Sequence, residues 1–268
     1  MTDASTLRRR RRTTAALAGA AALAIVLALA LWPSEGNPRP GASTNLPGPA
    51  ESLLKVPKPE LLRDHPNASL WSIVRRPVTA RAAPDADART VAGLDVTTPE
   101  DTAHALLILD RASDERGRVW VKARLPVLPN GTTGWVPRKA IGGYRAVKTR
   151  LVVDLSRFRA TLLRDGRPVM RADVGVGLPQ WPTPRGRFLI RNRLVRFSSE
   201  FYGPLAFGTS ARSAVLTDWP GGGFIGIHGT NQPELLPGRV SHGCIRMRNA
   251  EIVRLGRLMP VGTPMEVL

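Results

Sequence analysis

The sequence has only one cysteine, Cys244, among its 268 residues. An intramolecular disulfide is therefore excluded. No cysteine stands near the end of the apolar segment at the N-terminus, which excludes lipoprotein anchoring. In an exported protein, a thiol without a disulfide partner is either inert or retained as a nucleophile. The residues just before it, His242 and Gly243, favour the second interpretation.

Acidic residues are also few: 21 Asp and Glu stand against 39 Lys and Arg, a formal net charge of +18. Such a charge attracts polyanions over long range, so nucleic acid, anionic lipid and anionic cell wall are candidate partners. The Arg- and Pro-rich usage of a GC-rich genome explains the same composition, and charge alone selects none of them. With 43% hydrophobic residues, the chain can build ordinary cores in one or two domains.

One apolar run, from Ala15 to Trp32, follows the five arginines Arg8 to Arg12. About 18 apolar residues just span a bilayer, and the preceding arginines favour a cytoplasmic N-terminus. We expect a basic cytoplasmic tail over 1–12 and a transmembrane anchor over 13–32, with the rest outside the cytoplasm. A cleaved signal peptide is the alternative, because Ala28-Leu29-Ala30 resembles a cleavage site. Both interpretations favour the membrane and the cell wall as surroundings and argue against nucleic acid.

A proline-rich linker is predicted over 33–67. Eight prolines stand between Pro33 and Pro66, with few aromatic or branched residues. Such a composition stays extended, at about 3 Å per residue, and does not pack into a core.

Residues 68–146 alternate short β-like runs with turn signals. The runs are Leu70 to Val74, Ala105 to Asp110, Arg118 to Ala123 and Gly134 to Pro137. Asn130-Gly131 is a strong hairpin dipeptide. The pattern of Arg118 to Ala123 followed by Gly134-Trp135-Val136 resembles the bacterial SH3-like domain, a small β-barrel whose members often bind wall peptides. An irregular β extension that packs on the next domain is the alternative.

Residues 147–268 are predicted to be mainly β, with one helix. Expected strands are Leu151 to Leu155, Arg159 to Leu163, Val169 to Val176, Arg187 to Ile190 and Gly223 to His228. Glu251 to Leu258 reads as a helix with Asn249 as a possible N-cap and with Ile252, Leu255 and Leu258 on one face. His65 and His104 are expected to be ordinary surface residues.

The residues around Cys244 match the needs of a cysteine nucleophile: a base, a group that orients the base, and donors for an oxyanion. His228 ends an apolar strand, and the carbonyl of Gly229 could accept its second N–H. In His242-Gly243-Cys244 a glycine lets successive N–H groups converge on one oxyanion. Arg246 could bind a substrate carboxylate.

These residues resemble the catalytic domain of the bacterial L,D-transpeptidases over roughly 148–268. The signature is a histidine, here in His228-Gly229-Thr230, then about a dozen residues, then Ser241-His242-Gly243-Cys244-Ile245-Arg246-Met247. Upstream, Thr183-Pro184-Arg185-Gly186-Arg187-Phe188 is similar to that family's substrate-side segment. Two motifs in the right order make the resemblance specific, whereas the loop between Phe197 and Asp218 carries no motif that defines a lid.

The resemblance implies a role for each matched residue. Cys244 would be the nucleophile and His228 the base, oriented by the Gly229 carbonyl, with the Gly243 and Cys244 N–H groups as the oxyanion hole. Ser241, His242 and Arg246 would line the site and bind substrate. His242 is too close in sequence to Cys244, in a tight turn, for its ring to meet the sulfur in line, which favours His228 as the base.

The resemblance also implies the reaction. The thiolate would attack the carbonyl before the terminal D-residue of a peptidoglycan stem tetrapeptide, release D-alanine and form a thioester. An amine of a second stem would resolve it into a cross-link between third residues. No metal or other cofactor is expected, since one cysteine and two close histidines supply no zinc set. A cysteine carboxypeptidase or endopeptidase on wall peptides, and a catalytically idle wall-binding protein, are the alternatives.

Overall fold

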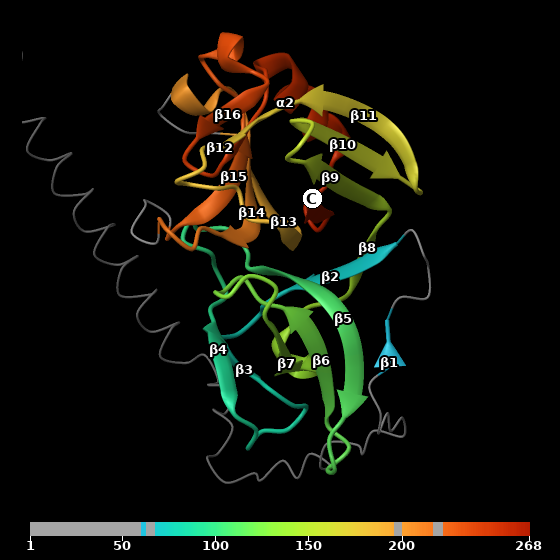
Figure 1. Cartoon of the computed structure of the whole chain (residues 1–268). Coiled ribbons are helices and arrows are strands. Elements are labelled where there is room, and N and C mark those ends of the chain that lie inside the picture. The colour runs from blue at the N-terminus through green and yellow to red at the C-terminus, as the bar shows by residue number, and fades with distance from the viewer. Residues whose placement is uncertain (1–59, 63–67, 196–199, 217–221) are drawn as a thin grey trace, which may run out of the picture. The chain divides into compact units, whose positions relative to one another are not determined.

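The computed structural model describes residues 60–62, 68–195, 200–216 and 222–268, all within one compact unit that spans 51–268. The predicted basic tail, the predicted anchor or signal segment, His65 and most of the predicted linker lie outside these residues. Within the described part of the chain, no helix is long and apolar enough to cross a membrane. Figure 1 shows the two β-sheets, with the earlier strands in blue and green and the later ones in yellow to red.

The first sheet has the strand order β4-β3-β7-β6-β5-β2-β8, with β1 also paired to β5. Its strands are β1 (Glu60–Leu61), β2 (Ser69–Ile73), β3 (Val78–Arg81), β4 (Thr90–Leu94), β5 (Ala105–Ser113), β6 (Val119–Arg124), β7 (Thr133–Pro137) and β8 (Arg145–Val147). A 3-10 turn, η1 (Arg138–Ala140), follows β7. All pairs in this sheet are antiparallel.

The four strands predicted for this region are confirmed as β2, β5, β6 and β7. The pattern missed β3, β4 and β8, each of which has only three to five residues. The dipeptide Asn130-Gly131 lies in the β6–β7 hairpin, as expected, although the connection is longer than two residues. Gly131 has φ +90°, a backbone conformation that favours glycine. The SH3-like resemblance stays a prediction.

Strand β5 is buried along almost its whole length because it contributes to two cores. Leu106 and Ile108 point into the first sheet's own core. Leu107 and Leu109, on the opposite face, pack in a cluster that includes Leu189 of the second sheet. Because successive side chains of β5 point to opposite faces, this one strand contributes to both cores and joins the two sheets through apolar contacts.

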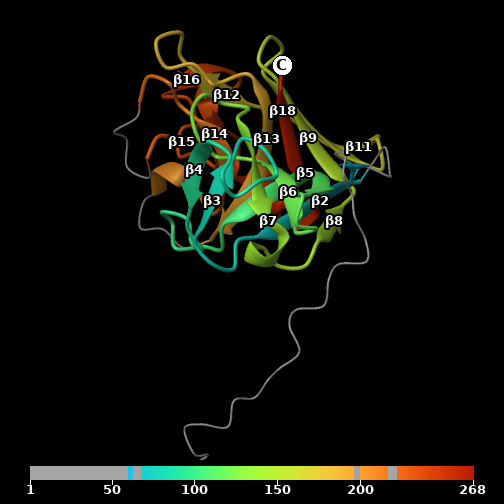
Figure 2. The same cartoon turned by 90° about the horizontal axis from the view of Figure 1, so that it is seen from below.

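The second sheet has the order β11-β10-β9-β18-β13-β14-β15-β17-β12-β16. Its strands are β9 (Thr149–Asp154), β10 (Arg159–Arg164), β11 (Arg167–Asp173), β12 (Gly175–Gly177), β13 (Gly186–Leu194), β14 (Ala206–Arg212), β15 (Phe224–His228), β16 (Gly238–Ser241), β17 (Ile245–Arg246) and β18 (Pro264–Val267). Between these strands the chain also forms the helix α2 (Asn249–Leu258) and two 3-10 turns, η2 (Glu200–Tyr202) and η3 (Pro233–Leu235). Figure 2 shows β18 beside β9 and β13.

The expectation of a mainly β chain with one helix here is confirmed, with two corrections. The single strand predicted from Val169 to Val176 is two strands, β11 and β12, which pair with different neighbours. The helix begins at Asn249, so the cap is Arg248, whose N–H donates to the Glu251 carboxylate at 3.3 Å. The predicted apolar face is confirmed, since Ile252 and Leu255 are buried in the core.

Two other expectations change on the first sheet. The predicted linker 33–67 was expected not to pack, yet Glu60–Leu61 pairs with β5 and Leu62 packs against the first core.

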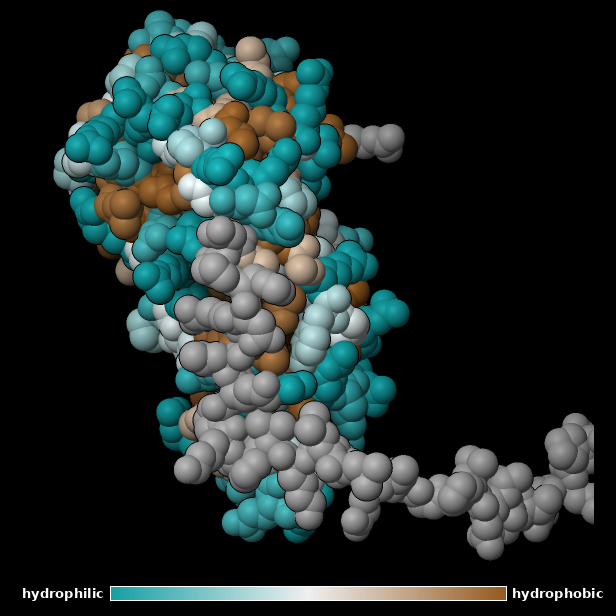
Figure 3. All heavy atoms as spheres, turned by 90° about the vertical axis from the view of Figure 1, so that its right-hand side faces the viewer, coloured by the Kyte–Doolittle hydropathy of each residue, from teal (hydrophilic) through white to brown (hydrophobic). Residues whose placement is uncertain are grey.

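His104 is buried rather than on the surface, and its Nδ1 lies 3.0 Å from the carbonyl oxygen of Asp95. Burial lowers the pKa of His104. Among the described residues that Figure 3 shows, hydrophilic side chains predominate, with hydrophobic patches between them.

Candidate active site

The candidate site lies on two neighbouring parallel strands, β15 and β17. His228 stands opposite Arg246, and Ile227 opposite Ile245. Because side chains alternate along a strand, Gly226 and His228 share one face with Arg246 of β17 and with Cys244, the residue just before β17. The alternate residues belong to the hydrophobic core: Ile225, which also borders the pocket, Ile227, Ile245 and Met247, the residue just after β17. A buried apolar face thus holds the reactive face in place.

Gly226 separates the thiol from the imidazole. Its N–H donates to Cys244 Sγ at 3.3 Å. A Cβ built on Gly226 would lie 3.8 Å from Sγ and 4.0 Å from His228 Cδ2. Both reactive side chains therefore border the same small space, which a glycine leaves unfilled.

The Cys244 thiol is half-buried and protonated at neutral pH in the resting site. Burial raises its pKa, and the Gly226 N–H and the Arg246 charge oppose that shift without cancelling it. A thiol of this kind needs a base to become a good nucleophile.

His228 is buried and oriented by its own backbone neighbour. Its Nδ1–H donates to the Gly229 carbonyl, with 2.6 Å between the nitrogen and the oxygen. Burial, together with the charge of Arg246, lowers the pKa of His228 to about 4 against the opposing Gly229 bond. The ring is therefore neutral at pH 7, with Nε2 as the basic nitrogen.

The turn before Cys244 is shaped by Gly243, Ser241 and Thr183. Gly243 has φ +114°, and a Cβ there would lie 3.0 Å from Ile225 Cδ1. Ser241 Oγ accepts the Gly243 N–H at 3.2 Å and donates to the Cys244 carbonyl. Thr183 Oγ1 accepts the Gly177 N–H at 2.9 Å and donates to the Gly243 carbonyl at 2.8 Å. The turn is therefore fixed from two sides.

A pocket of about 200 Å³ opens over these groups. Tyr202 meets the His228 ring edge-on at 4.8 Å, and the Arg246 guanidinium lies 5.0 Å from the Phe201 ring. The pocket is lined by Phe201, Tyr202, Ser213, Leu216, Gly223, Phe224, Ile225, His228, Ser241, His242, Cys244 and Arg246. Its walls are mainly apolar, with the charge of Arg246 near the sulfur.

Five of the seven residues predicted for the site line this pocket: Cys244, His228, Ser241, His242 and Arg246. Gly229 and Gly243 contribute backbone groups behind it. Ser241 is buried and its hydroxyl bonds within the turn, and the substrate-binding role predicted for it stays a prediction. The Gly243 N–H donates to that hydroxyl in this resting structure, and the oxyanion role of Gly243 and Cys244 stays a prediction.

Sequence reasoning missed the aromatic walls. Phe201 and Tyr202 come from the loop in which no motif was found, and Phe224 comes from a predicted strand in which it was given no role at the site. Trp181 stacks on the His242 ring with 4.2 Å between centroids, and it stands two residues before Thr183, where the segment that the sequence singled out begins. Among the residues that the structure describes, no group of three or more His, Cys, Asp or Glu side chains could hold a metal ion.

Residues 148–267 match the family model of YkuD, the L,D-transpeptidase catalytic domain. The resemblance expected from the two motifs is thereby confirmed for this part of the chain. Two curated relatives share the description "Putative L,D-transpeptidase YkuD". The Bacillus licheniformis protein is 34% identical over 118 residues (44% of this chain), and that of Bacillus subtilis 33% over 113 residues (42%). The matches span 64% and 62% of those relatives, just under two thirds of their length.

Solved structures of L,D-transpeptidases are also similar to this chain. One from Enterococcus faecium, a C442S mutant, is 25% identical with a TM-score of 0.36 and covers 45% of this chain and 49% of its own. One from Mycobacterium tuberculosis is 16% identical with a TM-score of 0.39 and covers 61% of this chain and 90% of its own.

Proposed function

We propose that the protein is an L,D-transpeptidase, a cysteine acyltransferase that cross-links peptidoglycan stem peptides between their third residues. The observation that carries this proposal is the pairing of Cys244 and His228 across Gly226, on the part of the chain that matches the YkuD family model. The proposed substrate class follows from that family.

In the proposed first step, Cys244 Sγ bonds to the carbonyl carbon before the terminal D-residue while its proton passes to His228 Nε2. The Gly229 carbonyl holds the opposite nitrogen, so only Nε2 faces the reaction. The oxyanion that forms is stabilised by backbone N–H groups of the turn and by the nearby charge of Arg246. His228 then gives its proton to the departing D-alanine amine, which leaves a thioester on Cys244.

In the second step, an amine of another stem attacks the thioester. His228 accepts the amine proton, and the thiol leaves with a proton returned to it. The product is an amide between the two stems, and the free enzyme is restored. Because each transfer needs a neutral imidazole at its start, the lowered pKa of His228 suits this cycle at neutral pH.

We further propose that the protein works outside the cytoplasm, held by the segment 13–32 as a single-pass anchor or released to the wall if that segment is cleaved. The net charge of +18 is compatible with these anionic surroundings, although the charge alone does not distinguish the membrane from the wall. The first sheet is a candidate SH3-like wall-binding domain.

The proposal is tested with purified protein and a muropeptide that carries a tetrapeptide stem. Mass spectrometry should detect a dimer one D-alanine lighter than two substrates, and Cys244→Ser should give none. A tripeptide product without dimer would instead identify a carboxypeptidase, with water as the acceptor. Neither product, with no adduct on Cys244, would leave a wall-binding protein.

A further inference from the structure

Phe224, the first residue of β15, forms part of the pocket wall and lies beside two cations. The guanidinium carbon of Arg191 is 3.8 Å from the centre of its ring, and that of Arg212 is 4.9 Å away. Contacts of this kind are attractive, most strongly where water is excluded. Phe224 also shares a strand face with Gly226 and His228.

Arg191 is nearly inaccessible to solvent, with a side-chain exposure of 1%, and its charge is paired across the two sheets. Its Nη2 donates to the carboxylate of Glu100 at 3.1 Å, and its Nε donates to the Thr209 carbonyl at 2.7 Å. Glu100 stands in a tight loop of the first sheet, between β4 and β5, closed by the Thr98 N–H to the Thr102 carbonyl. Removing the partner of such a buried charge is destabilising, because it leaves the charge uncompensated.

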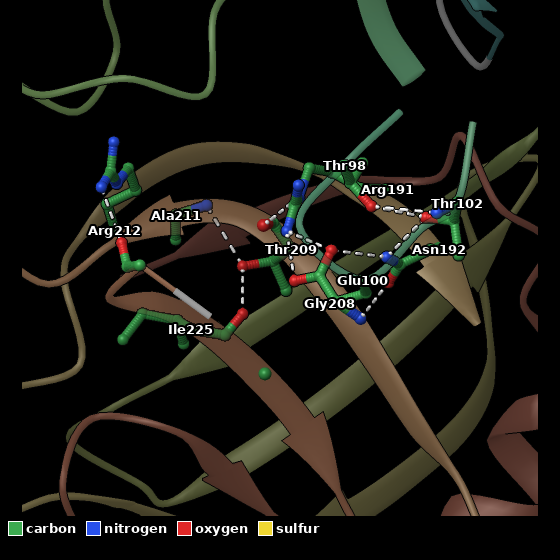
Figure 4. Close-up of polar contacts among 12 residues, drawn as sticks. Thr98, Glu100, Thr102, Arg191, Asn192, Gly208, Thr209, Ala211, Arg212 and Ile225 are labelled. Carbon is green, nitrogen blue, oxygen red and sulfur yellow. Dashed lines mark hydrogen bonds and ion pairs between the residues drawn. The ribbon is translucent and has the colours of Figure 1, made fainter. Parts of the chain in front are cut away.

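Irregular strand pairing explains why the Arg191 side chain reaches Glu100 and the Thr209 carbonyl. The β13–β14 register shifts between Ile190 and Asn192, so Arg191 has no directly opposite partner. The β14–β15 register also shifts, beyond Gly208, and the Thr209 hydroxyl there donates to the Ile225 carbonyl at 2.7 Å. Figure 4 shows this path from Glu100 through Arg191 and Thr209 to Ile225, the residue next to Phe224.

Arg212 is held from the first sheet as well, by a different loop. The side-chain amide of Asn130, in the β6–β7 hairpin, donates to the Arg212 carbonyl at 2.7 Å. Its oxygen accepts the Arg212 N–H at 3.0 Å. Asn130 thereby pairs with the last residue of β14 as a neighbouring strand would. The Arg212 side chain in turn donates to the Gly222 carbonyl at 2.6 Å, just before β15.

We infer that Glu100 and Asn130 are positioning residues for the active site: through Arg191 and Arg212 they hold Phe224, and with it the wall that receives the stem peptide. The first sheet is then a part of the substrate-binding apparatus. The inference rests on the proposed function for the identity of the substrate. The arrangement itself is independent of it, because it concerns the shape of the pocket over Cys244.

The expected consequence is selective. Phe224 is two residues from Gly226 and forms part of the pocket wall, so its displacement should weaken substrate binding more than it slows the chemical steps. Glu100→Gln and Asn130→Ala should each raise KM for the donor stem by about five- to thirtyfold, the range of a lost cation–π contact, with kcat changed less than about threefold.

Each test variant has a matched control substitution, and all variants are made in the full-length protein. Glu115→Gln makes the same change at an exposed glutamate of the first sheet, and Thr132→Ala removes a hydroxyl that bonds within the Asn130 loop. Both should leave KM unchanged. The double variant Glu100→Gln/Arg191→Met removes the unpaired buried charge. It should regain thermal stability relative to Glu100→Gln but keep the raised KM, because no cation returns to Phe224.

A second readout does not depend on turnover. Cys244 is the only thiol, so the ratio of its rates with a bulky maleimide and with iodoacetamide reports the shape of the pocket. The ratio should change at least about threefold in both Glu100→Gln and Asn130→Ala and in neither control. If the parent protein makes no cross-link yet the ratio still changes, the proposed function fails and the positioning role stands.

Two results would overturn the inference. One is a KM and a labelling ratio within twofold of the parent in both Glu100→Gln and Asn130→Ala. The other is a KM that returns to the parent value in the double variant together with its stability, since that would make the Glu100–Arg191 pair a purely structural contact.

Discussion

His228 and Cys244 both rest uncharged at neutral pH, and burial is the main cause for each. It lowers the pKa of the imidazole to about 4 and raises that of the thiol. The site therefore holds no preformed thiolate–imidazolium pair. In the proposed mechanism the proton therefore moves as the substrate carbonyl is attacked, and the developing charge is stabilised by Arg246 and by the backbone N–H groups of the turn.

This arrangement predicts an unusual pH profile. A histidine of ordinary pKa, near 6.5, loses its basic form as the pH falls through that value. With its pKa lowered to about 4, His228 stays a neutral base as the pH falls from 6.5 to about 4. The acid limb of kcat/KM should therefore have its midpoint near pH 4, measured with the donor muropeptide from pH 3.5 to 8. A midpoint near 6.5 would show that burial does not govern this imidazole.

A second prediction separates the two histidines near the thiol. His228→Ala should abolish measurable acylation of Cys244 near neutral pH, because the thiol then has no base and keeps its raised pKa. His242→Ala should retain slow acylation, since that exposed ring stacks on Trp181 at the pocket edge. Intact-mass time courses on both variants check this, and the reverse ranking would make His242 the base.

The sequence was sufficient to predict residues that the structure brings together around one pocket, Cys244, His228 and Arg246 among them, because the spacing around the only cysteine carries the motif. It could not predict Phe224 or Tyr202 as pocket walls, because a single aromatic residue in a strand or turn reads the same whether it faces a core or a pocket. The role of Asn130 was also hidden. Its hairpin was predicted from Asn130-Gly131, but its bond to Arg212 joins positions 82 residues apart.

Among the elements, the β15–β17 pair accounts for most of the site. Parallel pairing places His228 level with Arg246, and the isoleucines behind them are buried. Strand β15 could be predicted from its apolar run. Strand β17 has only two residues, too few for any periodicity, and β14 is broken by a register shift, so neither could be predicted.

A substitution at Thr183 tests whether the hydrogen bonds of its side chain hold the turn before Cys244 in place. Thr183→Val keeps the shape but leaves the Gly177 N–H and the Gly243 carbonyl without this hydroxyl. We expect a loss of about 1–3 kcal/mol in the free energy of unfolding, measured by denaturant titration, and at least about a tenfold loss of Cys244 acylation.

Thr183→Ser retains the hydroxyl and serves as the matched control. It should restore most of the acylation rate and lose less stability than the valine variant. Equal acylation by the valine and serine variants would mean that the turn keeps its geometry without Thr183.

For the whole molecule, the first sheet contributes to the second in two ways. It shares the apolar cluster that contains Leu107 and Leu189, and its loops reach Arg191 and Arg212. Composition and turn signals predicted two β-rich regions, but contacts between loops far apart in sequence leave no periodic signal. The predicted boundary near residue 147 remains a prediction.

The predicted location can be tested on cells. Five arginines before the apolar run should leave the folded part outside the cytoplasm. Protease added to intact spheroplasts should digest the chain after Pro33, while a cytoplasmic marker stays intact. A protected C-terminus would place the protein inside and return nucleic acid to the candidate partners.

In the proposed reaction, Cys244 carries the acyl group. Purified protein incubated with the tetrapeptide muropeptide and quenched in acid should gain the mass of the donor minus D-alanine, and peptide mapping should place it on Cys244. Cys244→Ser should gain no such mass and should lose turnover by several orders of magnitude. An adduct on another residue, or a serine variant that cross-links at a comparable rate, would contradict the account.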